Sequence, residues 1–179
     1  LSPVKDHFTF LKAAALLSSQ VSNAFFIISG EEVEIKTAQL RQVSKQLGIA
    51  EKILFLEKFA DVREVIDRVD VGVVCSYGSE AVSRITAEFM AMSKPVIVTR
   101  INVLPEMIID GKDGFIVPAR SPENLSRRMQ ELVQNTQLLA QMKENARKTA
   151  ENRFSYQRFY QDTIEVYEKV IIKFSESTP

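Results

Sequence analysis

The segment spanning residues 78–91 combines turn-forming, hydroxyl and charged side chains in a pattern that could bind an anionic ligand. Gly78 and Ser79 favour a tight turn, and Ser83 is typical of a helix N-cap. A helix that begins there directs unpaired backbone N–H groups out of its first turn, where the helix dipole favours negative charge. Arg84 falls in that first turn, where a cation is unfavourable unless an anion is near. It either serves such a ligand or points to solvent.

Two carboxylates lie on either side of this predicted helix start. Glu80 falls in the loop, and Glu88 lies about one and a half turns into the helix. The pair could bracket one elongated polar ligand, because each carboxylate accepts hydrogen bonds from hydroxyl groups. The spacing alone is weak evidence, since charged residues are this far apart by chance in most proteins.

The elements that must position this segment alternate between short apolar runs and helical patterns. The alternation predicts an α/β fold, a Rossmann-like parallel sheet with helices on both faces, in which ligands bind at the carboxyl ends of the strands. We expect strands at 24–29, 53–56, 71–75, 95–98 and 114–118, and helices at 35–47, 62–69 and 86–92.

The last third of the chain is predicted to be helical. Ser121 and Pro122 are typical of a helix start, and further helices are expected over 136–152 and from Tyr156 onward. We expect residues 1–154 to form the Rossmann-like domain and residues 155–179 to form a helical C-terminal extension.

The beginning of the chain predicts an incomplete sheet. A helical pattern starts near Asp6 with almost nothing before it, and no apolar signal sequence precedes it. We therefore expect a fragment whose first strand is truncated. Such a sheet has a gap or an unpaired edge, which favours self-association.

The composition excludes several classes of protein. The 179 residues carry 23 basic and 23 acidic side chains, so the basic excess of a general nucleic-acid binder is absent. Cys75 and His7 are the only residues of their types, which excludes an internal disulfide and a thiolate metal cluster. We interpret Cys75 as a core thiol. No apolar run approaches the length of a membrane span, about 18 residues.

Several segments of the sequence together resemble the nucleotide-sugar half of group 1 (family 4) retaining glycosyltransferases. The order and spacing hold over roughly forty residues, and the strand that ends at Gly30 fits as well. The matching segments are Glu80-x7-Glu88, Phe89 to Thr99, Pro105-Glu106, Asp110 to Pro118 and Ser2 to His7. The resemblance implies the GT-B architecture, with two Rossmann-like domains across a cleft and this chain as the C-terminal one.

The resemblance also implies roles for individual residues. Glu80 and Lys5 would be the catalytic pair, with Glu80 on the hydroxyls of the donor sugar and Lys5 on the diphosphate. Glu88 would bind the nucleotide ribose. The further substrate-binding positions are Val82, Ser83, Arg84, Gly30 and Glu106. The donor would be a nucleotide-diphosphate sugar such as a UDP- or GDP-sugar, transferred with retention, and no metal or other cofactor is expected because no Asp-x-Asp motif is present.

The resemblance places the acceptor, a saccharide or glycolipid, on an N-terminal domain toward which the last helix would pack. It implies a cytoplasmic enzyme of polysaccharide, lipopolysaccharide or glycolipid synthesis, with the full-length protein at the inner face of the plasma membrane. The isolated domain is expected to be inactive.

Some residues depart from the family pattern. Ala81, Val82 and Ser83 replace aromatic and glycine residues. Members often have glycine where Ser93 stands and a glycine pair where Asn102-Val103 stand. The alternative hypothesis is therefore a catalytically degenerate nucleotide-sugar binding or regulatory module of the same fold. A receiver-type signalling domain shares the alternation but needs acidic residues at the end of a first strand, and this chain shows none.

Overall fold

The structure is a computed structural model that describes residues 1–56, 61–78 and 81–176. Its strands are β1 (Phe26–Ser29), β2 (Ile53–Leu56), β3 (Gly72–Val74), β4 (Val96–Thr99) and β5 (Gly114–Val117). The α-helices are α1 (His7–Ser18), α2 (Thr37–Gln46), α3 (Arg63–Asp67), α4 (Arg84–Ala91), α5 (Leu104–Met107), α6 (Pro122–Gln134), α7 (Thr136–Arg153) and α8 (Tyr156–Glu176). Two 3-10 turns, η1 (Pro3–Lys5) and η2 (Ala50–Lys52), complete the described elements.

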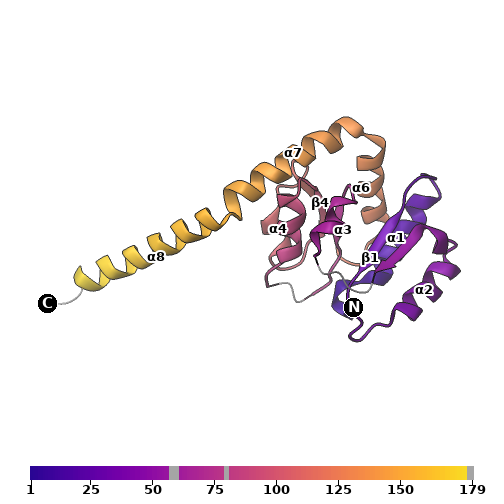
Figure 1. Cartoon of the computed structure of the whole chain (residues 1–179), viewed down its shortest axis with the longest axis horizontal. Coiled ribbons are helices and arrows are strands. Elements are labelled where there is room, and N and C mark those ends of the chain that lie inside the picture. The colour runs from indigo at the N-terminus through magenta and orange to yellow at the C-terminus, as the bar shows by residue number, and fades with distance from the viewer. Residues whose placement is uncertain (57–60, 79–80, 177–179) are drawn as a thin grey trace.

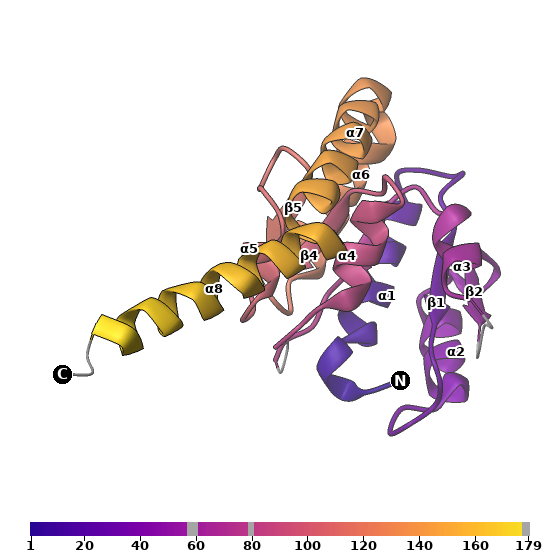
Figure 2. The same ribbon diagram turned by 60° about the vertical axis from the view of Figure 1, so that its left-hand side comes forward.

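All pairings among the described strands are parallel, as the alternation predicts. They form two sheets, one of β1 and β2 and one in the order β3-β4-β5. Figure 2 separates them, with β1 and β2 beside α2 and α3, and β4 and β5 beside α4, α5 and α7. The prediction of a parallel α/β fold is confirmed, and no pairing joins β1 to β3 among the described residues.

Helices cover both faces of the strands because alternate strand residues face opposite sides. In β4, Ile97 packs in the cluster that holds Leu11 of α1 and Leu132 of α6. Its neighbours Val96 and Val98 pack in a second cluster with α4, α5 and α7. Every residue of β4 is buried, which is typical of a central parallel strand.

One glycine is required by the packing of β4 against β5. Gly114 opens β5, and a Cβ there would lie 2.2 Å from the carbonyl oxygen of Val96. Beside it, the buried carboxylate of Asp113 accepts hydrogen bonds at 2.7 Å from the backbone N–H of Ile109 and the hydroxyl of Thr149. These contacts attach the start of β5 to α7.

The C-terminal helix α8 leaves the body of the molecule (Figure 1). It follows α7 directly and exposes most of its large apolar side chains, among them Phe159, Tyr160, Tyr167 and Ile171. The expected helical extension is present. The division into parts at residue 154 remains a prediction.

Candidate functional site

The candidate site lies at the carboxyl ends of the strands, around the loop that connects β3 to α4. Parallel strands bring their carboxyl ends to one edge, so the residues that follow β3 and β4 meet there. Thr99, the last residue of β4, donates a hydrogen bond from its hydroxyl to the carbonyl oxygen of Ser76 just after β3. This bond fixes the start of the loop that carries residues 78–83.

Ser83 occupies the N-cap position of α4, as predicted, and the helix begins at Arg84, two residues before the expected start. The Ser83 side chain is buried and its hydroxyl lies 2.8 Å from the hydroxyl of Thr86, so it does not cap the helix. The backbone N–H of Thr86 donates to the Ser83 carbonyl oxygen at 3.1 Å. The backbone N–H of Thr86 is therefore bonded within the helix start. We had expected the N–H groups of this first turn to be available to a ligand. Arg84 and Ile85 supply the N–H groups that a helix start leaves without intrahelical partners.

The side chains around this helix start differ in exposure. Val82 exposes 74% of its surface, and Arg84 is also exposed, whereas Glu88 is half-buried one turn further along α4. Glu80 lies outside the described residues. The structure therefore places four of the predicted residues, Val82 to Arg84 and Glu88, on one loop and helix start.

Lys5 approaches this edge from the N-terminal segment. It is the last residue of η1 and is exposed. The segment is held beside the end of β3 because the backbone N–H of Tyr77 donates to the carbonyl oxygen of Val4 at 3.0 Å. The thiol of Cys75 adds a contact to the carbonyl oxygen of Lys5 at 3.2 Å. A lysine and a helix N-terminus at one sheet edge form a positive environment suited to an anion.

Gly30 and Glu106 occupy the rim of this edge. Gly30 follows β1 with φ of 153°, and a Cβ there would lie 3.2 Å from Cδ2 of Leu1. Glu106 is exposed in the first turn of α5, which follows β4. The backbone carbonyl of Glu106 accepts a hydrogen bond from Arg153 at the end of α7, at 2.7 Å. The described contacts of these two residues are thus structural.

His7 has a setting that the sequence did not indicate. The ring of His7 is partly buried, and Nδ1 has no hydrogen-bond partner among the described residues. Burial lowers the pKa of His7 to about 4. The positive charges of the chain N-terminus and Lys5 also lower that pKa, while Asp6 opposes them. Asp6, rather than His7, caps α1 and accepts a hydrogen bond from the N–H of Thr9.

Two further residues at this edge, Arg120 and Tyr77, were not predicted from the sequence. The guanidinium of Arg120 lies 4.2 Å from the centre of the Tyr77 ring, in the loop that leads to α4. Arg120 lies three residues after β5, far from Tyr77 in the sequence, so no local sequence signal predicts their contact.

Cys75 fits the predicted core thiol, because burial raises its pKa to about 12 and leaves it a poor nucleophile.

The described residues contain no group of three or more His, Cys, Asp or Glu side chains placed to hold a metal ion. Among these same residues, no helix is both long enough and apolar enough to cross a membrane.

The fold and the site define a parallel α/β domain with a helix N-terminus and a lysine at the carboxyl edge of its strands. The family model described as "Glycosyl transferases group 1" matches residues 1–149. The chain therefore belongs to the group 1 glycosyltransferases, with the GT-B fold that the resemblance implies.

Individual relatives agree with this membership. The chain is 28% identical over 163 residues to EpsD from Bacillus subtilis (strain 168), provisionally named a glycosyltransferase, and the match covers 91% of this chain and 42% of EpsD. A structure of Anabaena Alr3699/HepE in complex with UDP superposes with a TM-score of 0.87 at 24% identity, covering 94% of this chain and 46% of that one. The chain thus spans less than half the length of each of these two proteins.

A third match is to an isolated domain. The C-terminal domain of the group 1 glycosyltransferase LpcC from Francisella tularensis has a TM-score of 0.79 at 22% identity. That match covers 87% of this chain and 83% of the other. The part of the fold represented here therefore corresponds to the C-terminal domain of that protein.

Proposed function

We propose that this chain is the donor-binding domain of a retaining glycosyltransferase that uses a nucleotide-diphosphate sugar. The observation that carries the proposal is that the loop after β3 leads to the start of α4 and is also bonded, through Tyr77, to the segment that carries Lys5 at the carboxyl edge of the strands. The family membership supports the proposal, and so do the relatives of the same fold in complex with UDP and with UDP-glucose.

The proposed roles follow from the charges of the donor. The diphosphate lies against the N–H groups of Arg84 and Ile85, and Lys5 neutralises it. Glu88 accepts hydrogen bonds from the ribose hydroxyls, while Glu80 does so from the sugar. Val82, Gly30 and Glu106 form the rim of the donor site. No divalent ion is needed, since Lys5 and the helix N-terminus supply the positive potential.

In the proposed reaction, the bond between the anomeric carbon and the diphosphate oxygen breaks while the acceptor oxygen attacks from the same face. The acceptor proton passes to the leaving phosphate. Negative charge grows on that phosphate, and fixed donors aimed at developing charge are usually the largest catalytic term. Loss of one such donor typically costs about 10²–10³ in rate, which is the effect we expect for Lys5→Ala in the full-length enzyme.

The acceptor, a saccharide or glycolipid, would bind on an N-terminal domain, and α8 would pack toward that domain. Its apolar face is exposed in the described structure, which supports a partner surface. We propose a cytoplasmic location, with the whole protein at the inner membrane face. The chain by itself would then bind donor without transferring sugar.

Calorimetry with UDP and GDP tests donor binding. Glu88→Gln is expected to weaken UDP and uridine binding equally, by about tenfold or more, because hydrogen bonds to a charged group contribute about 1.5–3 kcal/mol. Lys5→Ala is expected to weaken UDP binding but leave uridine binding unchanged. Glu123→Gln, an exposed glutamate of α6, is the matched control. A folded chain that binds neither nucleotide at millimolar concentration contradicts the proposal.

The second candidate is a non-catalytic nucleotide-sugar module. It is favoured by the Ala81-Val82-Ser83 segment, where a large apolar side chain, Val82, is exposed beside the helix start. The two candidates differ in the full-length protein. Sugar transfer from any member of a donor panel to any acceptor excludes the non-catalytic module. Donor binding that is accompanied by neither sugar transfer nor donor hydrolysis supports it.

A further inference from the structure

Arg120 and Tyr77 form a contact between two loops at the carboxyl edge of the strands. The guanidinium carbon of Arg120 lies 4.2 Å from the centre of the Tyr77 ring, within the range of a cation–π interaction. Tyr77 lies in the loop that leads from β3 to α4, and Arg120 lies between β5 and α6. The contact therefore links the loop of the proposed donor site to the segment that follows the outer strand of the β3-β4-β5 sheet.

The backbone on either side of Arg120 is held by regular elements. Val117 ends β5, and its carbonyl oxygen accepts a hydrogen bond at 2.8 Å from the N–H of Arg100, the residue after β4. Ser121 directly follows Arg120 as the N-cap of α6, and its carbonyl oxygen accepts from the N–H of Leu125 at 3.1 Å. Leu125 is buried in the core. The guanidinium of Arg120 thus extends from a fixed backbone.

The position of Arg120 is unfavourable for an arginine in two respects. Its φ is 57°, in the left-handed region where a residue with a Cβ is strained and glycine is preferred. It also directly precedes the N-cap of α6, and a positive charge near a helix N-terminus is destabilising. Strained residues persist where the surrounding structure fixes them, and they concentrate at functional sites. The stacking on Tyr77 offsets part of this cost.

Tyr77 and its neighbour fix the end of the donor loop that is nearest to β3. The backbone N–H of Tyr77 donates to the carbonyl oxygen of Val4 at 3.0 Å. One residue earlier, the carbonyl oxygen of Ser76 accepts a hydrogen bond from the hydroxyl of Thr99. These two bonds hold the main chain, whereas the stacking on Arg120 holds the ring. The side chain of Tyr77 is therefore oriented by a residue from another loop.

We propose that Arg120 is a positioning residue for the donor loop, which it holds in place through the ring of Tyr77. The inference rests on the proposed function, in which the N–H groups at the start of α4 bind the diphosphate. Only residues 78–82 separate Tyr77 from Ser83, the N-cap of α4, so a displaced ring affects the helix start. A loop that is fixed before binding loses less conformational freedom when the ligand binds.

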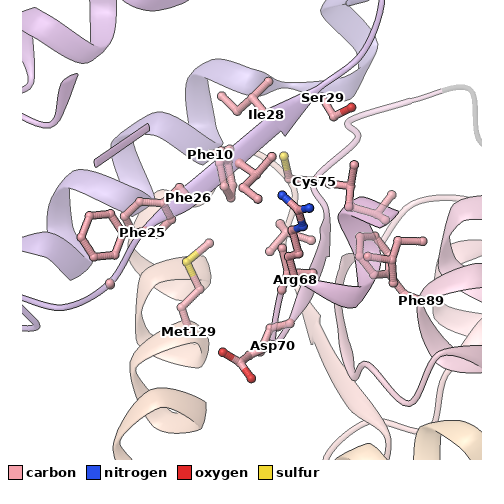
Figure 3. Close-up of a pocket in the computed structure, with 18 of the residues that line it drawn as sticks. Phe10, Phe25, Phe26, Ile28, Ser29, Arg68, Asp70, Cys75, Phe89 and Met129 are labelled. Carbon is pink, nitrogen blue, oxygen red and sulfur yellow. The ribbon is translucent and has the colours of Figure 1, made fainter. Parts of the chain in front are cut away.

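This contact is separate from the cavity of about 750 Å³ that lies between β1 and β3. Figure 3 shows that cavity with Phe26 and Cys75 at its walls. The described residues that line it do not include Arg120 or Tyr77. The contact between the two loops therefore does not depend on what occupies the cavity.

Arg120→Gly separates positioning from stability. Glycine suits the left-handed backbone, so we expect a melting temperature within about 3 °C of that of the unaltered chain. By calorimetry, UDP binding should weaken about two- to fivefold, the factor that an exposed cation–π contact contributes. Uridine binding should stay unchanged, because its proposed partner Glu88 lies in the body of α4 rather than in the loop. GDP and guanosine replace these probes if the chain binds GDP alone.

A double-mutant cycle with Tyr77 tests whether Arg120 acts through the ring. Tyr77→Leu keeps the charge of Arg120 but removes the ring, and we expect the same loss of UDP affinity. Tyr77→Phe keeps a ring and should bind UDP as the unaltered chain does. The combined variant Arg120→Gly with Tyr77→Leu should lose no more affinity than either change alone, because both remove one contact. Arg127→Gln, at an exposed arginine of α6, is the control for loss of a positive charge.

The outcomes distinguish this inference from the proposed function. Unchanged UDP affinity in the folded Arg120→Gly variant would overturn the inference and leave donor binding intact. Additive losses in the combined variant would give Arg120 an effect that is independent of the ring, which also overturns it. Equal weakening of UDP and uridine binding would indicate a general loss of structure instead of positioning. An unaltered chain that binds neither UDP nor GDP contradicts the proposed function and, with it, this inference.

Discussion

At the residue scale, the site depends on a few groups whose surroundings set their chemistry. The buried hydroxyl of Ser83 turns away from solvent toward Thr86, so the helix start remains bordered by backbone N–H groups. The φ of Ser83 is −109°, which requires no glycine. The replacement of a family glycine at this position is therefore compatible with an open helix N-terminus. His7, behind this edge, is a partly buried group whose pKa is lowered to about 4 by that burial.

His7 is predicted to make the stability of the chain depend on pH between 7 and 5. Its pKa is about 4 in the folded state and 6.5 when unfolded, so the unfolded chain binds a proton first as the pH falls. Stability is full above pH 6.5 and is lost as the pH falls toward 4. We expect a loss of about 1 kcal/mol between pH 7 and 5, after allowance for the partly exposed ring.

Thermal melts at a series of pH values check this expectation. His7 is the single histidine, so no other imidazole titrates in the same range. His7→Gln should flatten the dependence between pH 7 and 5. An unchanged slope in that variant would assign the effect to other groups and contradict the prediction.

At the element scale, the end of α4 explains one departure from the family sequence. Ser93 has φ of 59°, in the left-handed region. Its N–H donates to the carbonyl oxygen of Met90, and the N–H of Lys94 donates to that of Phe89. These two bonds form a Schellman motif, in which the left-handed position favours glycine. Asn102 has φ of 46°, and asparagine tolerates this region better than serine. These are two of the positions at which the resemblance implies glycine.

Ser93→Gly is predicted to stabilise the chain. A left-handed residue with a Cβ costs roughly 1–2 kcal/mol, and the added freedom of glycine in the unfolded chain returns part of that gain. We expect a net stabilisation of about 0.5–1 kcal/mol in urea denaturation. Ser121→Gly, at a serine with φ of −121°, is the control and should destabilise or have no effect. A less stable Ser93→Gly variant would mean that the serine hydroxyl has a role that the described contacts do not show.

At the scale of the whole molecule, two surfaces are left without a partner in the described structure. One is the cavity between β1 and β3, and the other is the apolar face of α8. The helix carries Tyr156, Phe159, Tyr160, Tyr167 and Ile171 at more than half exposure. An amphipathic helix with such a face is normally buried against another element.

The exposed apolar face of α8 is predicted to cause concentration-dependent self-association. Removal of residues 156–179 should reduce that association while leaving the core intact. Phe154 stays in the shortened chain because it packs against the second core cluster. We expect the melting temperature to change by less than about 3 °C, since α8 buries little apolar surface. Light scattering over a range of concentrations measures the association. Equal association of both chains would implicate the strand edges instead of α8.

Much of the fold was predictable from the local pattern. Apolar runs such as 53–56 and 96–98 specify buried parallel strands, and Ser83, Ser121 and Gly48 mark helix ends where the structure has them. These signals lie within a few residues of the element that they define. The observed ends of the elements differ from the predicted ends by one to two residues. For example, α4 begins at Arg84 rather than at Thr86.

The sequence by itself determined the element order, the parallel α/β class and the loop after β3 as the candidate site. Only the tertiary structure decided which distant groups meet there, namely Arg120 on Tyr77, Val4 bonded to Tyr77 and Thr99 bonded to Ser76. It also decided that the sheet opens between β1 and β3 into a cavity with strand edges as walls. The reason is physical. Periodicity and capping act between near neighbours in the chain, whereas contacts across a sheet depend on strand order, which no local pattern encodes.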